Sequence, residues 1–258
     1  MKKAQWSVGL IGTGNLTDSP LTRFWWLSER LGPVKSTSYR LASRIANILR
    51  AGHAVKDYAE FESCSLILIC VPDKTVEHVI SELLSAEISW NGKAVVLCST
   101  WLDSSDLHPL SERGAATGSI SPIPGFEDER YLVEGDPLAI RQSKSLVEYR
   151  ERRALAIERP LKPFFLAALT CTGTLAFALF RAAFESLQHA GIPPAISALL
   201  LERQTTRTLR SFLKGGRRAY PEPRELPRQL RALSAANTEL AHYFEQSTRL
   251  ASRLASKR

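Results

Sequence analysis

The sequence lacks the residue patterns that mark metal centres, serine hydrolases and P-loop nucleotide-binding proteins. Its four cysteines do not pair at metal-ligand spacing, and its five histidines are scattered along the chain. No His-Glu-x-x-His, Gly-x-Ser-x-Gly or Walker sequence occurs. We therefore expect no metal site, and we expect reduced cysteines packed as small apolar side chains in a cytoplasmic protein.

Long apolar runs are also scarce. The N-terminal residues contain no apolar run of the length found in secretory signals. Residues 164–180 carry no charge, but this run is short for a membrane span and includes three threonines and a glycine. A helix buried inside a helical domain or a dimer explains the run better than a membrane-spanning segment.

Positive charge is concentrated in the second half of the chain. Residues 1–149 hold 15 Lys and Arg against 18 Asp and Glu, whereas residues 150–258 hold 19 against 8. This asymmetry raises the alternative of a nucleic-acid interface, but no interleaved aromatic residues or nucleic-acid motif accompany it. We favour a solvated helical face that attracts anionic ligands. The core of the basic stripe is Arg203, Arg207, Arg210, Lys214, Arg217 and Arg218.

The first half of the chain alternates apolar runs of strand length with amphipathic segments of helix length. Strands are predicted at 7–11, 34–38, 66–71, 94–99 and 118–123, and helices at 20–31, 40–49 and 75–84. Later helices are predicted at 161–190, 195–213 and 227–256, the last as one or two helices. The predicted fold class is α/β, a Rossmann-type doubly wound parallel sheet followed by an all-α C-terminal domain. We place an NAD(P)-binding domain at 1–155 and a helical substrate and dimerisation domain at 156–258.

A Gly-x-Gly sequence directly follows the first predicted strand. The first glycine permits a tight turn, and the second lets the backbone approach a dinucleotide pyrophosphate. The third position of the usual motif is not glycine, and the next helix is expected to start late, so the loop is predicted to be longer than usual. The alternative is a plain tight turn. The predicted pyrophosphate contacts are Gly12, Thr13, Gly14, Asn15 and Leu16.

The end of the second predicted strand favours NADP over NAD. NAD-binding proteins place a carboxylate there for the ribose hydroxyls, whereas this chain has none between residues 36 and 40. Ser38, Tyr39 and Arg40 are instead suited to a 2′-phosphate and the adenine. The alternative is that Arg40 and Arg44 belong to a solvated helix face.

Two further strand ends complete the predicted cofactor site. Val71 and Pro72 can pack against ribose and nicotinamide, and Ser99 and Thr100 lie at the same edge of a parallel sheet. Asp73 is equally suited to capping the next helix, so no catalytic role is assigned to it.

The order and spacing of several short motifs resemble a known superfamily. It contains the pyrroline-5-carboxylate reductases and the 6-phosphogluconate dehydrogenases, and the closest resemblance is to its uncharacterised bacterial branch, domain of unknown function 2520. The motifs are Gly12-Thr13-Gly14, Val71-Pro72-Asp73, Gly118-Ser119-Ile120-Ser121-Pro122 with Phe126, Glu134-Gly135-Asp136, and the helix from Lys162 to Gly191-Ile192-Pro193. The resemblance implies a homodimer paired through the helical half, with the substrate pocket between one Rossmann domain and the helical domains.

The chain departs from that family where chemistry is expected. Ser121 stands where relatives often have histidine, and Phe164, Phe165 and Gly173 replace a Tyr-His pair and an asparagine. Lys162 is the ionisable residue at the start of the long helix, where related dehydrogenases often carry catalytic groups. Lys162 and Ser121 are therefore the catalytic candidates.

Two functions follow from these residues. The first is an NADP-dependent oxidoreductase that reduces a small imine or 2-oxo acid, with the hydride supplied by the cofactor. The alternative is a non-catalytic dinucleotide-binding or regulatory protein, favoured by the replaced polar positions. Both predict a small-molecule ligand rather than a nucleic acid or a membrane.

Overall fold

The computed structural model describes residues 7–12, 30–125, 130–148, 153–216 and 224–256. The predicted pyrophosphate contacts from Thr13 to Leu16 lie outside these residues, as does nearly all of the predicted helix at 20–31. The chain divides into two compact units, Met1–Leu166 and Ala167–Arg258.

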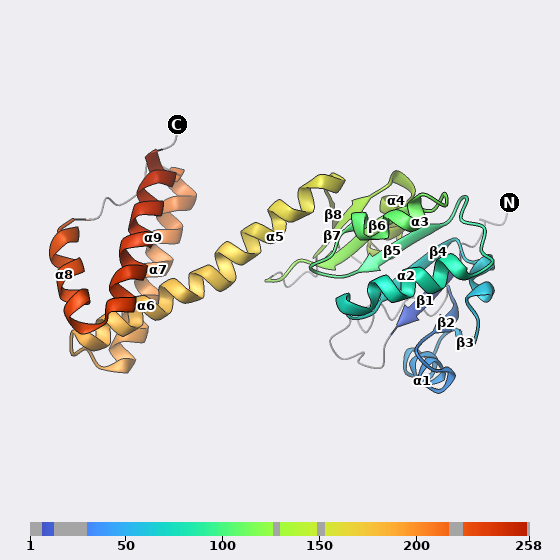
Figure 1. Cartoon of the computed structure of the whole chain (residues 1–258), viewed down its shortest axis with the longest axis horizontal. Helices are drawn as coiled ribbons and strands as arrows, with labels where there is room; N and C mark the ends of the chain where they lie inside the picture. The colour runs from blue at the N-terminus through green and yellow to red at the C-terminus, as the bar shows by residue number, and fades with distance from the viewer. Residues whose placement is uncertain (1–6, 13–29, 126–129, 149–152, 217–223, 257–258) are drawn as a thin grey trace. The chain divides into compact units, whose positions relative to one another are not determined.

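The first unit is built on an eight-stranded sheet with the order β3-β2-β1-β4-β5-β6-β7-β8 (Figure 1). All neighbouring strands are parallel except β6 and β7, which are antiparallel. The predicted doubly wound sheet is confirmed. The strands are β1 (Val8–Gly12), β2 (Leu31–Lys35), β3 (His53–Ala54), β4 (Leu66–Cys70), β5 (Ala94–Cys98), β6 (Ala116–Pro122), β7 (Arg130–Gly135) and β8 (Arg153–Ala156).

The second strand lies earlier than predicted. It was expected at 34–38, but β2 spans Leu31–Lys35 and includes Gly32 and Pro33. Gly-Pro is ordinarily a turn signal, yet here Leu31 pairs with Val8 of β1 and Pro33 pairs with His53 of β3. Pairing with β1 therefore overrides the local preference, and residues 36–38 follow the strand instead of ending it.

Helices cover both faces of the sheet. On one face, α1 (Tyr39–Leu49) and α4 (Pro137–Val147) pack Ile45 and Leu146 against apolar residues of the central strands. On the other face, α2 (Val76–Ser85) and α3 (His108–Ser111) enclose a second core that includes Phe61 and Leu83. Central strands β4 and β5 are buried along their whole length, because both faces are covered.

The second unit is helical, as predicted. The predicted helix at 161–190 is formed by α5 (Lys162–Thr170), a π-helical turn at Cys171–Leu175 and α6 (Ala176–His189). Gly191, with φ of 77°, ends it. The helices α7 (Pro194–Gly215), α8 (Leu226–Ala236) and α9 (Thr238–Ser256) follow (Figure 1), and within this unit α6 contacts α7 and α9, and α8 contacts α9.

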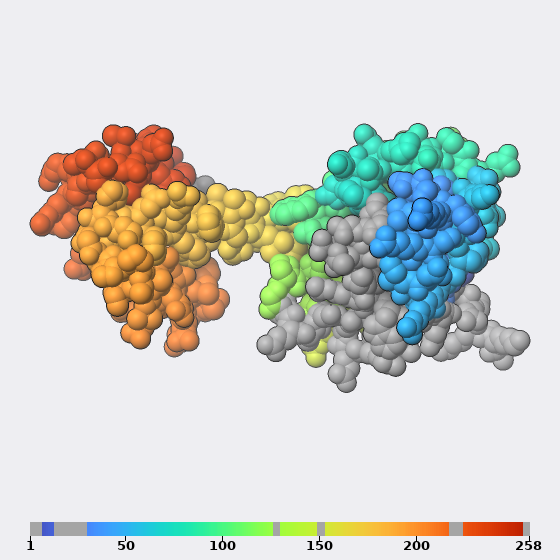
Figure 2. All heavy atoms as spheres, turned by 90° about the horizontal axis from the view of Figure 1, so that it is seen from below, coloured from blue at the N-terminus to red at the C-terminus, as the bar shows by residue number. Residues whose placement is uncertain are grey.

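Few side chains of the second unit are buried. Among its described residues only Ser197, Leu240 and Ala241 are buried, whereas large apolar side chains such as Phe177 are exposed. One helix of the described chain, Arg159–His189, is long and apolar enough to cross a membrane by length and composition. Figure 2 shows the atoms of α6, in orange, at the surface of this unit. A single copy of this unit therefore leaves most of its apolar surface uncovered.

Candidate functional site

The strand order changes direction at β1, which lies between β2 and β4. In open α/β sheets this switch point, at the carboxyl ends of the strands, is where ligands bind. Gly12 ends β1 beside Cys70 of β4, and Cys98 ends β5 beside Ile120 of β6. The structure therefore brings the predicted residues Gly12, Val71 and Ser99 to one edge of one sheet.

Gly12 is not required by the packing around it. A Cβ built at this position would meet its nearest neighbours, Ile45 and Leu10, at 3.6 and 3.9 Å, which are ordinary contact distances. By contrast, a Cβ at Gly9 would lie 2.4 Å from Phe61. The described fold therefore demands glycine at position 9 but would accept a Cβ at position 12, so the glycine there is better explained by the close approach of a ligand.

The end of β2 is tied to the same edge. The buried Ser36 hydroxyl donates a 2.6 Å hydrogen bond to the Gly12 carbonyl. Ser38 begins α1 as its N-cap and accepts from the amide of Leu41, and no acidic residue lies in the first turn. The exposed Tyr39 and Arg40 follow directly. A helix N-terminus without carboxylates favours an anion, as the prediction of a 2′-phosphate requires.

Hydrogen bonds within segment 99–102, which follows β5, hold its backbone in place. The Ser99 hydroxyl donates to the carboxylate of Asp73 at 2.8 Å and accepts from the amides of Trp101 and Leu102. The Asp73 carboxylate thus links the end of β4 to the end of β5, and no side chain caps α2. Thr100 lies within this segment, half-buried.

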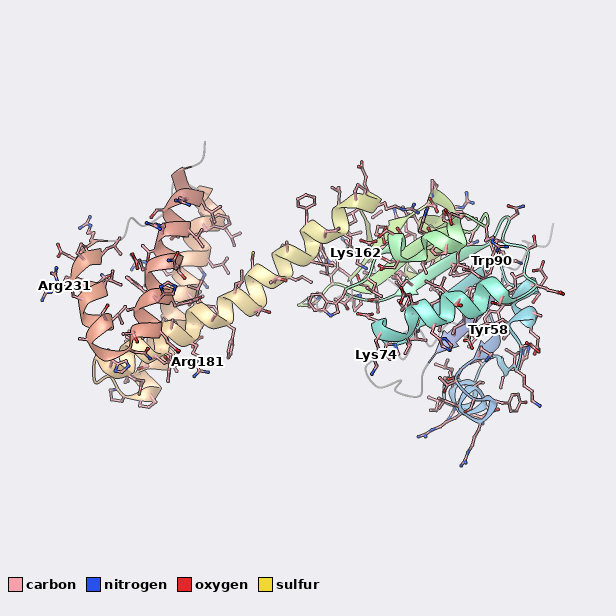
Figure 3. All side chains as sticks on the ribbon, in the orientation of Figure 1. Tyr58, Lys74, Trp90, Lys162, Arg181 and Arg231 are labelled. Atoms are coloured by element: carbon pink, nitrogen blue, oxygen red, sulfur yellow. The ribbon has the colours of Figure 1, made fainter. Side chains whose placement is uncertain are left out.

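Lys162 lies where α5 meets the sheet (Figure 3) and is fully buried. Its ammonium donates to the carbonyl oxygens of Ser99 at 3.0 Å and Leu102, and to the Ser119 hydroxyl at 2.9 Å. These three acceptors match its three hydrogens. Burial lowers the pKa of Lys162, and the charge of Glu134 acts in the opposite direction.

Glu134 is the residue that the sequence-based site omits. It is buried and accepts hydrogen bonds from the Ser119 hydroxyl and from both the amide and the hydroxyl of Ser104, at 2.8 and 2.6 Å. Asp136 pairs with Arg159 at 2.9 Å just before α5. The Glu-Gly-Asp motif, noted only for its resemblance, therefore holds the two basic residues at the start of the long helix.

The Ser121 hydroxyl, unlike those of Ser99 and Ser119, makes no hydrogen bond among the described residues. Ser121 is fully buried in β6, two residues beyond Ser119 toward the carboxyl edge. Buried hydroxyls are usually paired, so an unpaired one at the predicted ligand edge is a candidate for contact with a ligand.

All four cysteines are free. Cys64, Cys70 and Cys98 are buried as predicted, whereas Cys171 is exposed in the π-helical turn. Burial, and then the neighbouring Cys98 thiol, raise the pKa of the Cys70 thiol well above its usual value. The Cys70 thiol is thus protonated at neutral pH and packs as a small apolar group. The described residues contain no cluster of metal-ligating side chains.

The basic stripe of the second half lies on one helix. Arg203, Arg207, Arg210 and Lys214 are exposed along α7, whereas Arg217 and Arg218 lie outside the described residues. These side chains belong to the helical unit, whereas the predicted cofactor contacts belong to the first unit.

No family model and no curated protein sequence matches the chain. Solved structures do match it over nearly its whole length. An imine reductase from Aspergillus terreus in complex with NADPH4 and a dibenzazepine is 18% identical, with a TM-score of 0.69, and the match covers 97% of this chain and 94% of that one.

Two other structures extend the comparison. An imine reductase variant from Myxococcus stipitatus in complex with NAD+ is 14% identical, with a TM-score of 0.69, covering 96% of this chain and 94% of that one. A Thermotoga maritima protein is 18% identical, with a TM-score of 0.64, covering 97% and 100%. The chain therefore has the fold of these structures, a Rossmann-type sheet followed by a helical region, and its structural neighbours include dinucleotide-binding oxidoreductases.

Proposed function

We propose that this protein is an NADP-dependent oxidoreductase that reduces a small imine or 2-oxo acid. The observation that carries the proposal is a glycine at position 12, at the switch point of the sheet, where the packing of the described residues would accept a Cβ and so does not itself require glycine. The match to imine reductases along the whole chain supports the reaction class. Membership of domain of unknown function 2520 is part of the same proposal and rests on the motifs alone.

We assign the binding of the cofactor to the ends of four strands, β1, β2, β4 and β5. Gly12 is assigned to the pyrophosphate, together with Thr13, Gly14, Asn15 and Leu16, which lie outside the described residues. The start of α1 receives the 2′-phosphate through Ser38, Tyr39 and Arg40. The nicotinamide end lies against Val71, Pro72, Ser99 and Thr100. A bound nicotinamide supplies the hydride.

We assign the contact with the substrate to Ser121, since its buried hydroxyl has no partner among the described residues. A serine hydroxyl can orient a C=N or C=O group but is a poor acid at neutral pH. The proton is therefore expected to reach the substrate from water that the hydroxyl orients.

The alternative function is a dinucleotide-binding protein without catalysis. The hydrogen bonds of Lys162 favour it, because all three of its hydrogens already have acceptors. Oxidation of NADPH in the presence of a panel of small imines and 2-oxo acids separates the two functions. Turnover of any member supports the reductase, whereas tight NADPH binding with no turnover across the panel would establish the alternative.

Replacing Arg40 by alanine should reduce the difference in binding free energy between NADPH and NADH by about 1–3 kcal/mol. This is the range for losing a charge-assisted hydrogen bond. The change should leave NADH affinity nearly unaltered, because NADH lacks the 2′-phosphate. Calorimetric titration of both nucleotides measures it, and Arg44→Ala, one helical turn further along α1, is the control. Equal losses for NADPH and NADH would contradict the proposed 2′-phosphate contact.

We also propose that the protein forms a homodimer through its helical half. We propose domain bounds of 1–155 and 156–258, and a location in the cytoplasm. The exposed apolar face of α6 supports the dimer, because Phe177 and Phe180, three residues apart on one side of the helix, are 69% and 38% exposed in the single chain. A membrane is the competing explanation of this helix. The candidate membrane helix runs from Arg159 to His189, and its start is held against the sheet. Arg159 pairs with Asp136, and Lys162 donates to Ser119, which argues against a membrane.

A further inference from the structure

We propose that Lys162 is a positioning residue that fixes segment 99–102 at the cofactor edge, with Glu134 as its buried counter-charge through Ser119. The nucleotide part of this proposal rests on the proposed function. The structural part, a lysine that closes one short segment, stands on the hydrogen bonds of the first unit alone.

One ammonium holds both ends of the segment. The carbonyl oxygens of Ser99 and Leu102 both accept from Lys162, so the chain between them is closed into a small loop. Inside the loop, the Ser99 hydroxyl accepts from two backbone amides. Losing the ammonium would leave two carbonyl oxygens without their charged donor, and the segment free to leave the end of β5.

The charge of Lys162 is balanced inside the protein. A fully buried ammonium needs an opposite charge nearby, and the Ser119 hydroxyl connects it to Glu134 by accepting from Lys162 and donating to the carboxylate. Ser104 holds that carboxylate with two further hydrogen bonds. Burial lowers the pKa of Lys162, and the carboxylates of Asp103 and Asp106 act with Glu134 in the opposite direction.

This arrangement leaves Lys162 no hydrogen to offer a substrate. A general acid must reach the atom that it protonates, whereas each hydrogen of this ammonium already has a protein acceptor. Lys162 therefore acts on the ligand through the segment that it holds.

The chain contains a second buried lysine, Lys93, at the other end of β5, the strand that segment 99–102 follows. Lys93 immediately precedes β5 and donates to the carbonyl oxygens of Glu62 and Cys64, with the Glu62 carboxylate 3.9 Å away. It therefore has the same chemistry as Lys162 but lies at the amino edge of the sheet, away from the predicted cofactor contacts. Lys93→Met controls for the general cost of removing a buried lysine.

Hydrogen exchange measured by mass spectrometry tests the proposal on the full chain. We expect Lys162→Met to speed exchange of residues 99–104 by about 10- to 100-fold relative to the rest of the sheet, because it removes two hydrogen bonds from a charged donor. Lys93→Met should leave exchange at 99–104 unchanged. If Lys162→Met does not fold, Ser119→Ala removes only the hydroxyl between the two charges and should show the same local change more weakly.

A double variant separates positioning from stability. Lys162→Met with Glu134→Gln leaves no unpaired buried charge, so its melting temperature should recover relative to Lys162→Met alone. Exchange at 99–104 should nevertheless stay fast, because the carbonyl oxygens of Ser99 and Leu102 remain without their donor. Recovery of both properties together would overturn the positioning role and leave Lys162 as a stabilising residue.

Titration of the same variants with NADPH tests whether the position of segment 99–102 affects nucleotide affinity, which is the part of the proposal that rests on the proposed function. Lys162→Met and the double variant should both bind NADPH at least about 10-fold more weakly than the unmodified protein, whereas Lys93→Met should bind it equally. Fast exchange at 99–104 with unchanged NADPH affinity would overturn the role in ligand binding. Absence of NADPH binding by the unmodified protein would overturn the proposed function, with the exchange result still standing.

Discussion

Replacing Gly12 by alanine should weaken NADPH binding by about 10- to 100-fold while the melting temperature stays within error of the unmodified protein. The added methyl group would meet protein atoms only at ordinary contact distances of 3.6 Å or more. The methyl group would instead hinder a pyrophosphate that lies against the backbone at Gly12, at a cost of about 1–3 kcal/mol. Calorimetric titration and thermal unfolding measure the two quantities separately.

Gly9→Ala, on the same strand, is the matched control. Its methyl group would lie 2.4 Å from Phe61 in the core, so it should lower the free energy of unfolding by about 1–3 kcal/mol. The protein that remains folded should bind NADPH with unchanged affinity. Loss of stability in Gly12→Ala, or its normal nucleotide binding, would contradict the assignment of position 12 to the ligand.

A negative charge on the exposed apolar face of α6 should separate the proposed dimer. Phe177 is 69% exposed in the single chain, so Phe177→Glu should cost the monomer little. In a dimer that covers this face, an unpaired carboxylate would be buried, which costs several kcal/mol and raises the dissociation constant by at least about 100-fold. Analytical ultracentrifugation at micromolar concentration measures the change.

Thr206→Glu provides the control, because Thr206 is exposed among basic residues on α7 and carries the same new charge outside the apolar face. It should leave the association state unchanged. A well-folded monomer formed by the unmodified protein would rule out the dimer. Detergent-dependent solubility of the unmodified chain would instead point to a membrane as the cover of α6.

The parts of the fold that the sequence predicts are those with strong local patterns. Strands β4 and β5 are uninterrupted apolar runs, and α1 repeats apolar residues at helical spacing, so each was expected within one or two residues of its observed position. The strands β7 and β8 were not predicted. β8 is mostly exposed, with the sequence Arg-Ala-Leu-Ala, and therefore lacks the apolar pattern of a covered strand.

The candidate site was predictable only where it depends on backbone position. Gly12, Val71 and Ser99 reach one edge because they end neighbouring parallel strands, which follows from the order of the elements. The partnership of Lys162 with Glu134 depends on β7 pairing antiparallel to β6, which sets Glu134 beside Ser119. No local pattern predicts such a pairing. An acidic residue directly after Tyr131-Leu132-Val133 was nevertheless a usable signal, since a carboxylate in a buried strand requires partners.

Calorimetric titration of the unmodified protein with NADPH and with NADH tests the central claim most directly. We expect saturable binding of one nucleotide per chain, with NADPH bound more tightly, because the start of α1 carries Ser38 and Arg40 and no carboxylate in its first turn. Binding of neither nucleotide would contradict the assignment of the sheet edge to a dinucleotide. Tighter binding of NADH than of NADPH would contradict the role of Arg40.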